Sequence, residues 1–241
     1  MKYAVISDVH GNLEALNAVL KEIKNKNIRE IIFLGDAVGY GPDPDDCVNV
    51  LRSECSILIA GNHDWAVLGY TDIEYFNPIA KASVIWTREK ITRESLSILK
   101  TFAILKEIEN KKILLVHSTP KEPEKWHYLL TLWDAEINFH YFDNMICLIG
   151  HSHHPFIIER LPSGEMLTYK SKANFVKENR YIINVGSVGQ PRDGDPRACY
   201  ATIDEESVNI YRVNYNIEKT QEKMKTYGFQ TSLIERLNKG L

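Results

Sequence analysis

Short apolar runs that stop abruptly at polar residues recur along the first two-thirds of the chain. The first run extends from Tyr3 to Ile6 and is followed at once by Ser7-Asp8-Val9-His10. An apolar run of this length, bounded by turn residues, is typical of a buried strand. Because side chains alternate along a strand, Asp8 and His10 point to the same side if the extended conformation continues that far. The pattern therefore predicts a strand that places an acid and an imidazole together.

Segments with helical periodicity lie between these runs. Apolar residues recur every three or four positions from Leu13 to Ile23, and a second helix is expected from Pro44 or Asp45 to about Arg52. The pattern is helical again over residues 65–101, which we interpret as a helical insertion rather than a separate domain. Residues 219–237 are expected to close the chain as one or two amphipathic helices.

Further apolar runs predict a mixed α/β fold. In the first part of the chain strands are expected at Arg29–Leu34, Ser56–Ala60, Phe102–Ile108, Ile113–Val116 and Met145–Ile149. After His154 the chain is mostly β, with strands expected at Phe156–Leu161, Met166–Tyr169, Tyr181–Val185, Cys199–Ile203 and Val208–Val213. Open α/β sheets bind ligands at the carboxyl ends of their strands. No repeat or linker interrupts the pattern, so we expect a single domain over residues 1–241.

Composition and charge narrow the classes of function. The chain has 241 residues, 44% of them hydrophobic, which is enough to bury a substantial core. A formal net charge of −3 without a basic block provides no surface for duplex nucleic acid or an anionic membrane. The first apolar run is too short for a secretory signal, and the four cysteines form no Cys-x-x-Cys pair. We therefore expect a cytoplasmic protein with reduced thiols and a small-molecule partner, and the oligomeric state stays open.

Histidines gather where the predicted strands end. Six of the eight lie there: His10, His63, His117, His151, His153 and His154. One histidine in such a place is more often a core or loop residue than a ligand, but the clustering reverses that preference. Imidazole together with carboxylate suits Mn²⁺, Fe²⁺, Zn²⁺ or Ni²⁺, whereas an all-oxygen shell suits Ca²⁺ or Mg²⁺. The absence of nearby cysteine ligands argues against a structural zinc site.

Five motifs, taken in order, resemble those of the calcineurin-like metallophosphoesterase family. They are Asp8-Val9-His10, Gly35-Asp36, Gly61-Asn62-His63-Asp64, His117 and Gly150-His151-Ser152-His153. The stretch from Asn184 to Arg192 is also similar to the compact bacterial and archaeal members. The resemblance implies a four-layer αββα sandwich, in which two sheets carry helices on their outer faces, and a binuclear metal site at the carboxyl ends of the strands.

The resemblance also implies a ligand set for two divalent transition-metal ions. One ion would take Asp8, His10, Asp36 and His153, and the other would take Asp36, Asn62, His117 and His151, so that Asp36 bridges them. We expect Mn²⁺, with Fe²⁺, Zn²⁺ or Ni²⁺ as alternatives. Two such ions about 3.5–4 Å apart share a hydroxide that exists at neutral pH and attacks a phosphoryl group in line.

Residues next to the ligands have expected roles in the reaction. His63 follows the ligand Asn62, itself also a candidate substrate contact, and would face the other way on extended backbone. His63 would thus remain free to protonate the leaving alkoxide, with Asp64 orienting it. Arg192 is expected either to bind a substrate phosphate or to pair with a neighbouring aspartate. His154 is interpreted as a wall residue rather than a ligand.

One departure from the family bears on the substrate. Protein-phosphatase members carry an arginine after the bridging-acid motif and another beside the Asn-His motif, where this chain reads Ala37-Val38-Gly39-Tyr40 and Ala60 to Trp65. The absence of both arginines favours a phosphodiesterase or a broad phosphoesterase over a dedicated Ser/Thr phosphatase, and it does not exclude monoesters as substrates. The alternatives are a phosphomonoesterase acting on proteins or nucleotides, a dinucleoside-polyphosphate hydrolase and, outside enzymes, a scaffold subunit of the same fold.

Overall fold

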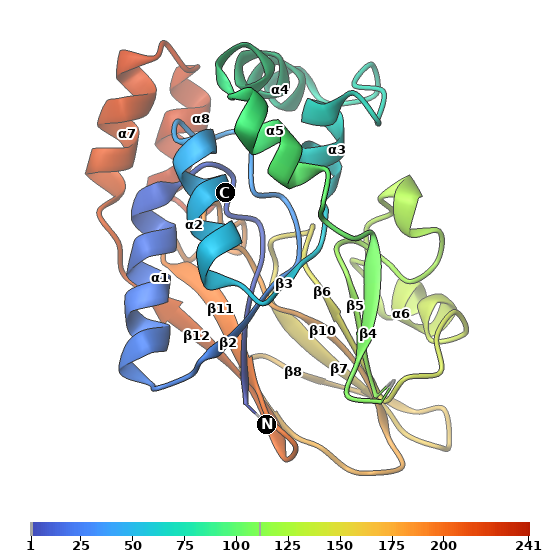
Figure 1. Ribbon diagram of the computed structural model, residues 1–241. Coiled ribbons are helices and arrows are strands. Elements are labelled where there is room, and N and C mark those ends of the chain that lie inside the picture. The colour runs from blue at the N-terminus through green and yellow to red at the C-terminus, as the bar shows by residue number, and fades with distance from the viewer. Residues whose placement is uncertain (1, 111) are drawn as a thin grey trace.

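Two six-stranded mixed sheets face each other in the computed structural model, which describes residues 2–110 and 112–241 (Figure 1). The first sheet has the order β3-β2-β1-β11-β12-β9, with β1 (Tyr3–Ile6), β2 (Glu30–Phe33), β3 (Ile57–Leu58), β9 (Lys172–Asn174), β11 (Ala198–Ile203) and β12 (Ser207–Val213). The second has the order β4-β5-β6-β10-β7-β8, with β4 (Leu105–Ile108), β5 (Ile113–Val116), β6 (Ile146–Ile149), β7 (Phe156–Arg160), β8 (Met166–Tyr169) and β10 (Arg180–Asn184).

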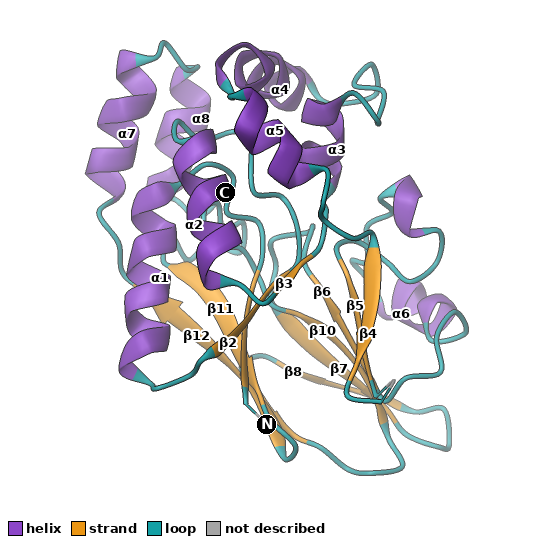
Figure 2. Cartoon of the chain, in the orientation of Figure 1, coloured by secondary structure: helices purple, strands orange, loops and turns teal. Residues whose placement is uncertain are grey.

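Helices cover the outer faces of both sheets (Figure 2). The helices that the structure describes are α1 (Leu13–Asn25), α2 (Pro44–Glu54), α3 (Asn62–Leu68), α4 (Pro78–Lys90), α5 (Arg93–Leu99), α6 (Leu132–Asn138), α7 (Ile217–Thr226) and α8 (Thr231–Glu235). Short 3₁₀ turns occur at Pro123–Lys125 and Arg236–Asn238. Among the described residues no helix combines the length and the apolar character that crossing a membrane requires.

Apolar side chains pack in three interfaces: between the two sheets and between each sheet and its helices. These three interfaces separate four layers, helices, sheet, sheet and helices. Outside the first sheet, Leu16 and Val19 of α1 pack with Phe33 of β2. Between the sheets, side chains such as Ile32 and Leu148 share one buried cluster. Outside the second sheet, the cluster around α6 joins residues of β5, β6, β7 and β10. Strands buried on both faces explain the continuous apolar runs, and the predicted αββα sandwich is confirmed.

Parallel strands bring the carboxyl ends of distant segments to one edge. In the first sheet β1 pairs in parallel with β2, and β2 with β3. In the second sheet β5, β6 and β10 are parallel neighbours. The loops that leave these strands therefore meet at one end of the sandwich, opposite the end where the N-terminus lies (Figure 1).

The structure corrects several element boundaries. The third strand covers only Ile57–Leu58, because Ile59 makes just one bridge to Ala103 and Gly61 already caps α3. The expected helical insertion corresponds to α3, α4 and α5. The short edge strand β9 was not predicted, because its sequence Lys-Ala-Asn has no apolar alternation. All four cysteines are buried as free thiols.

A buried carboxylate ties α1 to α7. Glu14 of α1 lies 2.8 Å from Nζ of Lys223 and 3.1 Å from Nζ of Lys219. Lys223 also contacts Asp43 at 2.9 Å. Burial opposes ionisation of Glu14, but the hydrogen bonds from the two lysines outweigh it and hold the pKa of the Glu14 carboxyl below its usual value. This cluster fixes the C-terminal helices beside the carboxyl ends of the strands.

We expect Lys223→Met to lower the free energy of unfolding by about 1–2 kcal/mol at pH 7, because it leaves two carboxylates without their shared cation. The folded-state pKa of Glu14 lies below its unfolded value, so this contribution is present above the unfolded pKa and fades as pH falls through the folded pKa. Urea denaturation at pH 7 and below about pH 4 measures both effects. Lys219→Met, at a side chain that is 59% exposed, is the control and should cost less than about 0.5 kcal/mol. Equal losses in the two variants would contradict this account.

Candidate metal centre

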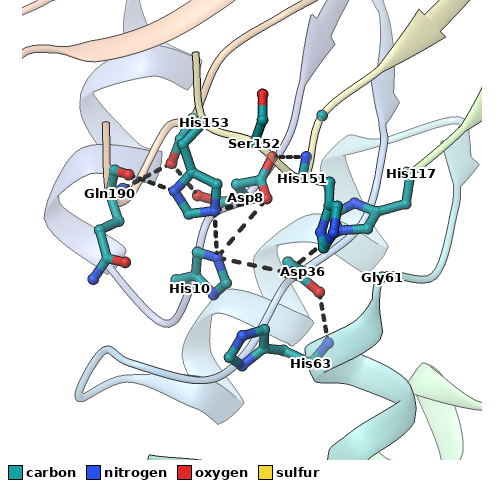
Figure 3. Close-up of polar contacts among 12 residues, drawn as sticks. Asp8, His10, Asp36, Gly61, His63, His117, His151, Ser152, His153 and Gln190 are labelled. Carbon is teal, nitrogen blue, oxygen red and sulfur yellow. Dashed lines mark hydrogen bonds and ion pairs between the residues drawn. The ribbon is translucent and has the colours of Figure 1, made fainter. Parts of the chain in front are cut away.

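Buried histidine and aspartate side chains converge where the parallel strands end (Figure 3). Ligand atoms lie within 4.8 Å of one another in three buried groups, which are Asp8/His10/His153, His10/Asp36/His63 and Asp36/His117/His151. They come from the loops after β1, β2, β5 and β6 and from the first turn of α3. The fold thus brings together the residues that the sequence pattern predicts as ligands.

Asp36 lies between the two outer groups. Its Oδ2 is 3.6 Å from Nε2 of His10 and 3.4 Å from Nε2 of His117. Its Oδ1 accepts a 2.8 Å hydrogen bond from the backbone N–H of His63. A carboxylate in this position reaches both halves of the cluster, as a bridging ligand must.

The first half of the cluster is built around Asp8. Its Oδ1 is 3.1 Å from Nε2 of His153 and 3.8 Å from Nε2 of His10. The two imidazole Nε2 atoms are themselves 3.2 Å apart. The Oδ2 atom of Asp8 accepts a 3.1 Å hydrogen bond from the backbone N–H of His151. Three ligand atoms therefore face one small volume.

Backbone carbonyls orient the imidazoles. The Nδ1 atoms of His10, His117 and His153 contact the carbonyl oxygens of Val38, Leu34 and Gln190 at 3.0, 2.7 and 2.5 Å. When Nδ1 donates to a carbonyl, Nε2 keeps its lone pair and faces the cluster as a ligand. His151 is turned the other way, because its Nε2 contacts the carbonyl of Trp126 at 2.9 Å, and Nδ1 is its free ring nitrogen.

Several buried polar atoms of the cluster have no hydrogen-bond partner among the described residues. They are Asp8 Oδ1, Asn62 Oδ1, His63 Nδ1 and His117 Nε2. Buried polar atoms are rarely left unsatisfied, since each costs about 1–3 kcal/mol. A divalent cation would satisfy the oxygens and the imidazole nitrogen at once, so the donor set fits the metals that the resemblance implies.

The ligands reach the centre by a different backbone route from the one predicted. The first strand ends at Ile6, and Asp8 and His10 adopt positive φ angles of 53° and 48° rather than an extended conformation. Asp36, His151 and His153 also have positive φ, at 60°, 65° and 60°. The alternation argument was therefore wrong in mechanism. Left-handed turns, which non-glycine residues adopt at a cost, aim these side chains at the centre.

His63 and Asp64 lie in a helix rather than on extended backbone, because Asn62 to Asp64 form the first turn of α3. The His63 ring packs against Tyr40 and His10, with centroids 4.5 and 4.9 Å apart. The expectation that Asp64 orients His63 was wrong. Its carboxylate instead accepts hydrogen bonds from four backbone N–H groups, those of Gly61, Asp36, Ala37 and Val38. Asp64 thus caps α3 and holds the loop that carries Asp36.

Burial and neighbouring charges shift the pKa values within the cluster. Burial opposes ionisation of Asp36, but the imidazoles of His117 and His63 outweigh it and hold the pKa of the Asp36 carboxyl well below its usual range. Burial lowers the pKa of His151 to about 3 and that of His63 to about 4. For His117 the Asp36 carboxylate overcomes burial and raises the pKa to about 9. Ionised carboxylates among mostly neutral imidazoles are the forms that bind metals.

Arg192 makes no ion pair with either neighbouring aspartate. Asp193 pairs with Arg212, and Asp195 with Arg197, whereas Nη2 of Arg192 donates a 3.0 Å bond to Oε1 of Gln190. His154 is exposed, and its Nδ1 contacts the carbonyl of Ser152 rather than the cluster.

Sequence reasoning missed three contributors to the centre. Trp126 and Gln190 act through backbone carbonyls, which leave no mark in a sequence. Tyr128 stacks on the His151 ring with centroids 4.1 Å apart. Its place in a loop without apolar periodicity gave no signal of that contact.

Comparison with known proteins agrees with the geometry. Residues 1–207 match the family described as the calcineurin-like phosphoesterase superfamily domain. The uncharacterized protein MJ0912 of Methanocaldococcus jannaschii is 42% identical over 97% of this chain and 96% of its own length. The crystal structure of a metallophosphoesterase from Sphaerobacter thermophilus is similar with a TM-score of 0.86 and 38% identity, covering 100% of this chain and 99% of that one.

A more distant likeness concerns the fold alone. The hypothetical protein PH1004 of Pyrococcus horikoshii superimposes with a TM-score of 0.78 at 20% identity, covering 100% of this chain and 98% of that one. The ordered motifs, the carbonyl-oriented imidazoles and a family match that spans residues 1–207 lead to one conclusion: the chain belongs to the calcineurin-like phosphoesterase superfamily.

Proposed function

We propose that the protein is a metal-dependent phosphodiesterase that uses two divalent transition-metal ions. The observation that carries the proposal is the buried cluster of carboxylates and imidazoles around Asp36, whose ligand atoms lie within 4.8 Å of one another in three groups. The buried Oδ1 of Asn62 has no hydrogen-bond partner among the described residues, which also fits a metal ligand. When bound, the two ions supply an activated water for in-line attack and neutralise charge on the phosphoryl oxygens. Mn²⁺ is the metal we propose first, with Fe²⁺, Zn²⁺ and Ni²⁺ as alternatives, because a mixed imidazole and carboxylate donor set suits ions of this class.

Each residue of the centre has a defined part in this proposal. Asp8, His10 and His153 would hold one ion, and Asn62, His117 and His151 would hold the other. Asp36 contacts both groups and would bridge the two ions. The neutral amide of Asn62 limits the negative charge placed on the second ion and leaves room for an anionic substrate.

His63 is the proposed general acid. It belongs to the buried Asp36 group but leaves Nδ1 without a hydrogen-bond partner among the described residues. Burial lowers the pKa of the His63 imidazole to about 4, and the negative charge of a phosphoester beside it would raise that pKa again. In that complex a protonated His63 would donate its proton to the leaving alkoxide.

The residues that face the reacting group favour a diester. The position after the bridging-acid motif is Tyr40, a neutral side chain that packs on the His63 and His10 rings. A phosphodiester carries one negative charge at the reacting phosphorus, while a monoester carries up to two. A neutral side chain at this position, where protein phosphatases of the family carry an arginine, therefore suits the single charge of a diester.

We expect the protein, stripped with a chelator and reloaded with Mn²⁺, to hydrolyse bis(p-nitrophenyl) phosphate with at least about tenfold higher kcat/KM than p-nitrophenyl phosphate. Release of p-nitrophenolate measures both rates, and the stripped protein is the control. Failure with Mn²⁺, Fe²⁺, Zn²⁺ and Ni²⁺ alike would overturn the hydrolase, whereas faster monoester turnover would overturn only the diester preference.

Asp36→Asn should reduce the bound metal from about two ions per chain to less than one, because one substitution removes charge from both halves of the centre. Asp8→Asn should remove mainly one ion. Elemental analysis after gel filtration measures this without reference to activity. Asp46→Asn, an exposed carboxylate on α2, should retain both ions. Two ions retained by Asp36→Asn would exclude its bridging role.

His63→Ala should keep its metals and lose activity in proportion to the difficulty of the leaving group. A general acid contributes about 10²–10⁴-fold, and less when the leaving group departs readily as an anion. We therefore expect a large loss of kcat with a phenyl diester and a small loss with a p-nitrophenyl diester. His154→Ala, at an exposed histidine outside the cluster, is the matched control. Equal losses on the two diesters would assign His63 a role other than proton donation.

A further inference from the structure

Two arginines from distant parts of the chain meet beside the metal centre. Arg192 lies in the loop before β11, and Arg236 begins the 3₁₀ turn after α8. Their guanidinium carbons are 5.5 and 4.7 Å from the centroid of the Tyr40 ring. Both donate to the same acceptor, Oε1 of Gln190, at 3.0 Å from Arg192 and 2.5 Å from Arg236.

This pair lies next to the residues that would handle the reacting phosphoryl group. The Tyr40 ring that carries both guanidinium groups also contacts the rings of His63 and His10, at 4.5 and 4.8 Å. The backbone carbonyl of Gln190 contacts Nδ1 of His153 at 2.5 Å (Figure 3).

No carboxylate among the described residues neutralises either arginine. The nearby aspartates are already engaged, since Asp193 pairs with Arg212 and Asp195 with Arg197. The Nε atoms of Arg192 and Arg236 are buried and lack a hydrogen-bond partner within residues 2–110 and 112–241. Both side chains are only partly exposed. Two like charges that share one amide oxygen repel each other, which is unfavourable unless an anion joins them.

The C-terminal helices are packed so as to hold Arg236 in this position. Leu233, Ile234 and Leu237 share a buried cluster with Tyr40 and Met224 of α7. Burial, followed by the charge of Arg192, lowers the pKa of Arg236 to about 10, so it remains charged at neutral pH. The family match ends at residue 207, which places Arg236 outside the matched domain.

We propose that Arg192 and Arg236 form a binding site for a second, non-reacting phosphate of the substrate. The planar guanidinium group of arginine can donate two parallel hydrogen bonds to phosphate oxygens. Two guanidinium groups beside one aromatic ring therefore suit a group with two negative charges. This inference rests on the proposed hydrolase function. It narrows the substrate class to phosphodiesters that carry a second phosphate, placed near His63.

Inhibition by inorganic pyrophosphate and by inorganic orthophosphate separates the two phosphate positions. Pyrophosphate spans both, whereas orthophosphate needs only the metals. With bis(p-nitrophenyl) phosphate as reporter, Arg236→Gln should raise the Ki of pyrophosphate at least about tenfold and that of orthophosphate less than about threefold. The concentration of free Mn²⁺ is held constant in all assays, so that chelation of Mn²⁺ by pyrophosphate affects every variant equally.

Matched variants distinguish a ligand contact from general charge or folding. Lys239→Gln removes one exposed charge three residues after Arg236 and should leave both Ki values unchanged. Arg236→Lys keeps the charge and the apolar stem but loses the fork, and should recover part of the affinity for pyrophosphate. Melting temperatures report whether any variant is misfolded.

Each outcome decides the proposal. An equal rise in both Ki values would mean that Arg236 binds the reacting phosphoryl group. No change in either Ki would mean that Arg236 has a purely structural role. Both results overturn a second phosphate site. If the wild type hydrolyses no diester, the hydrolase proposal fails by itself. Calorimetric titration of pyrophosphate into metal-loaded wild type and Arg236→Gln still tests the arginine pair in that case.

Discussion

The burial of two ionised carboxylates, those of Asp8 and Asp36, is the constraint on which the rest of the structure depends. Both are almost fully inaccessible to water, and a buried charge is tolerated only when it is paired and hydrogen-bonded. Each accepts one backbone N–H, from His151 and His63 respectively, and both otherwise face imidazoles. The loops after β1 and β2 are joined by three backbone bonds between residues 8–11 and residues 35–37. The scaffold therefore places the charges, and the proposed metal ions would complete their neutralisation.

This arrangement also explains why unfavourable backbone conformations persist at the centre. Left-handed φ angles at five of the ligand positions cost of order 1–3 kcal/mol each, so the surrounding contacts must fix them. Close packing supplies that restraint. A Cβ atom at Gly61 would lie 2.1 Å from Oδ1 of Asp36, and one at Gly150 would lie 2.1 Å from Oγ of Ser7. These glycines allow neighbouring loops to approach closely enough for the ligands to share one volume.

The residues of the site were easier to predict than the backbone that presents them. Ligands such as Asp8 and His117 were identifiable because each follows an apolar run, and parallel strands bring such ends together. The left-handed turns were not predictable, because they depend on hydrogen bonds to residues far along the chain. Asp64 was misassigned for the same reason, since its partners at residues 36–38 lie on another loop. Arg236 left no signal, because an arginine in an amphipathic helix is ordinarily a solvated charge.

If Arg236 binds phosphate as proposed, the C-terminal segment influences substrate choice without supplying a candidate metal ligand. The candidate metal ligands all lie within residues 1–207, the part that matches the family, and their positions are fixed by the buried charges of the strand ends. Arg236 is held from outside that part by apolar contacts between Tyr40 and the helices α7 and α8. Changes in those contacts would move a cation at the mouth of the site without disturbing the bonds that orient the imidazoles. A fold built in this way can change which anions it accepts while its metal centre stays the same.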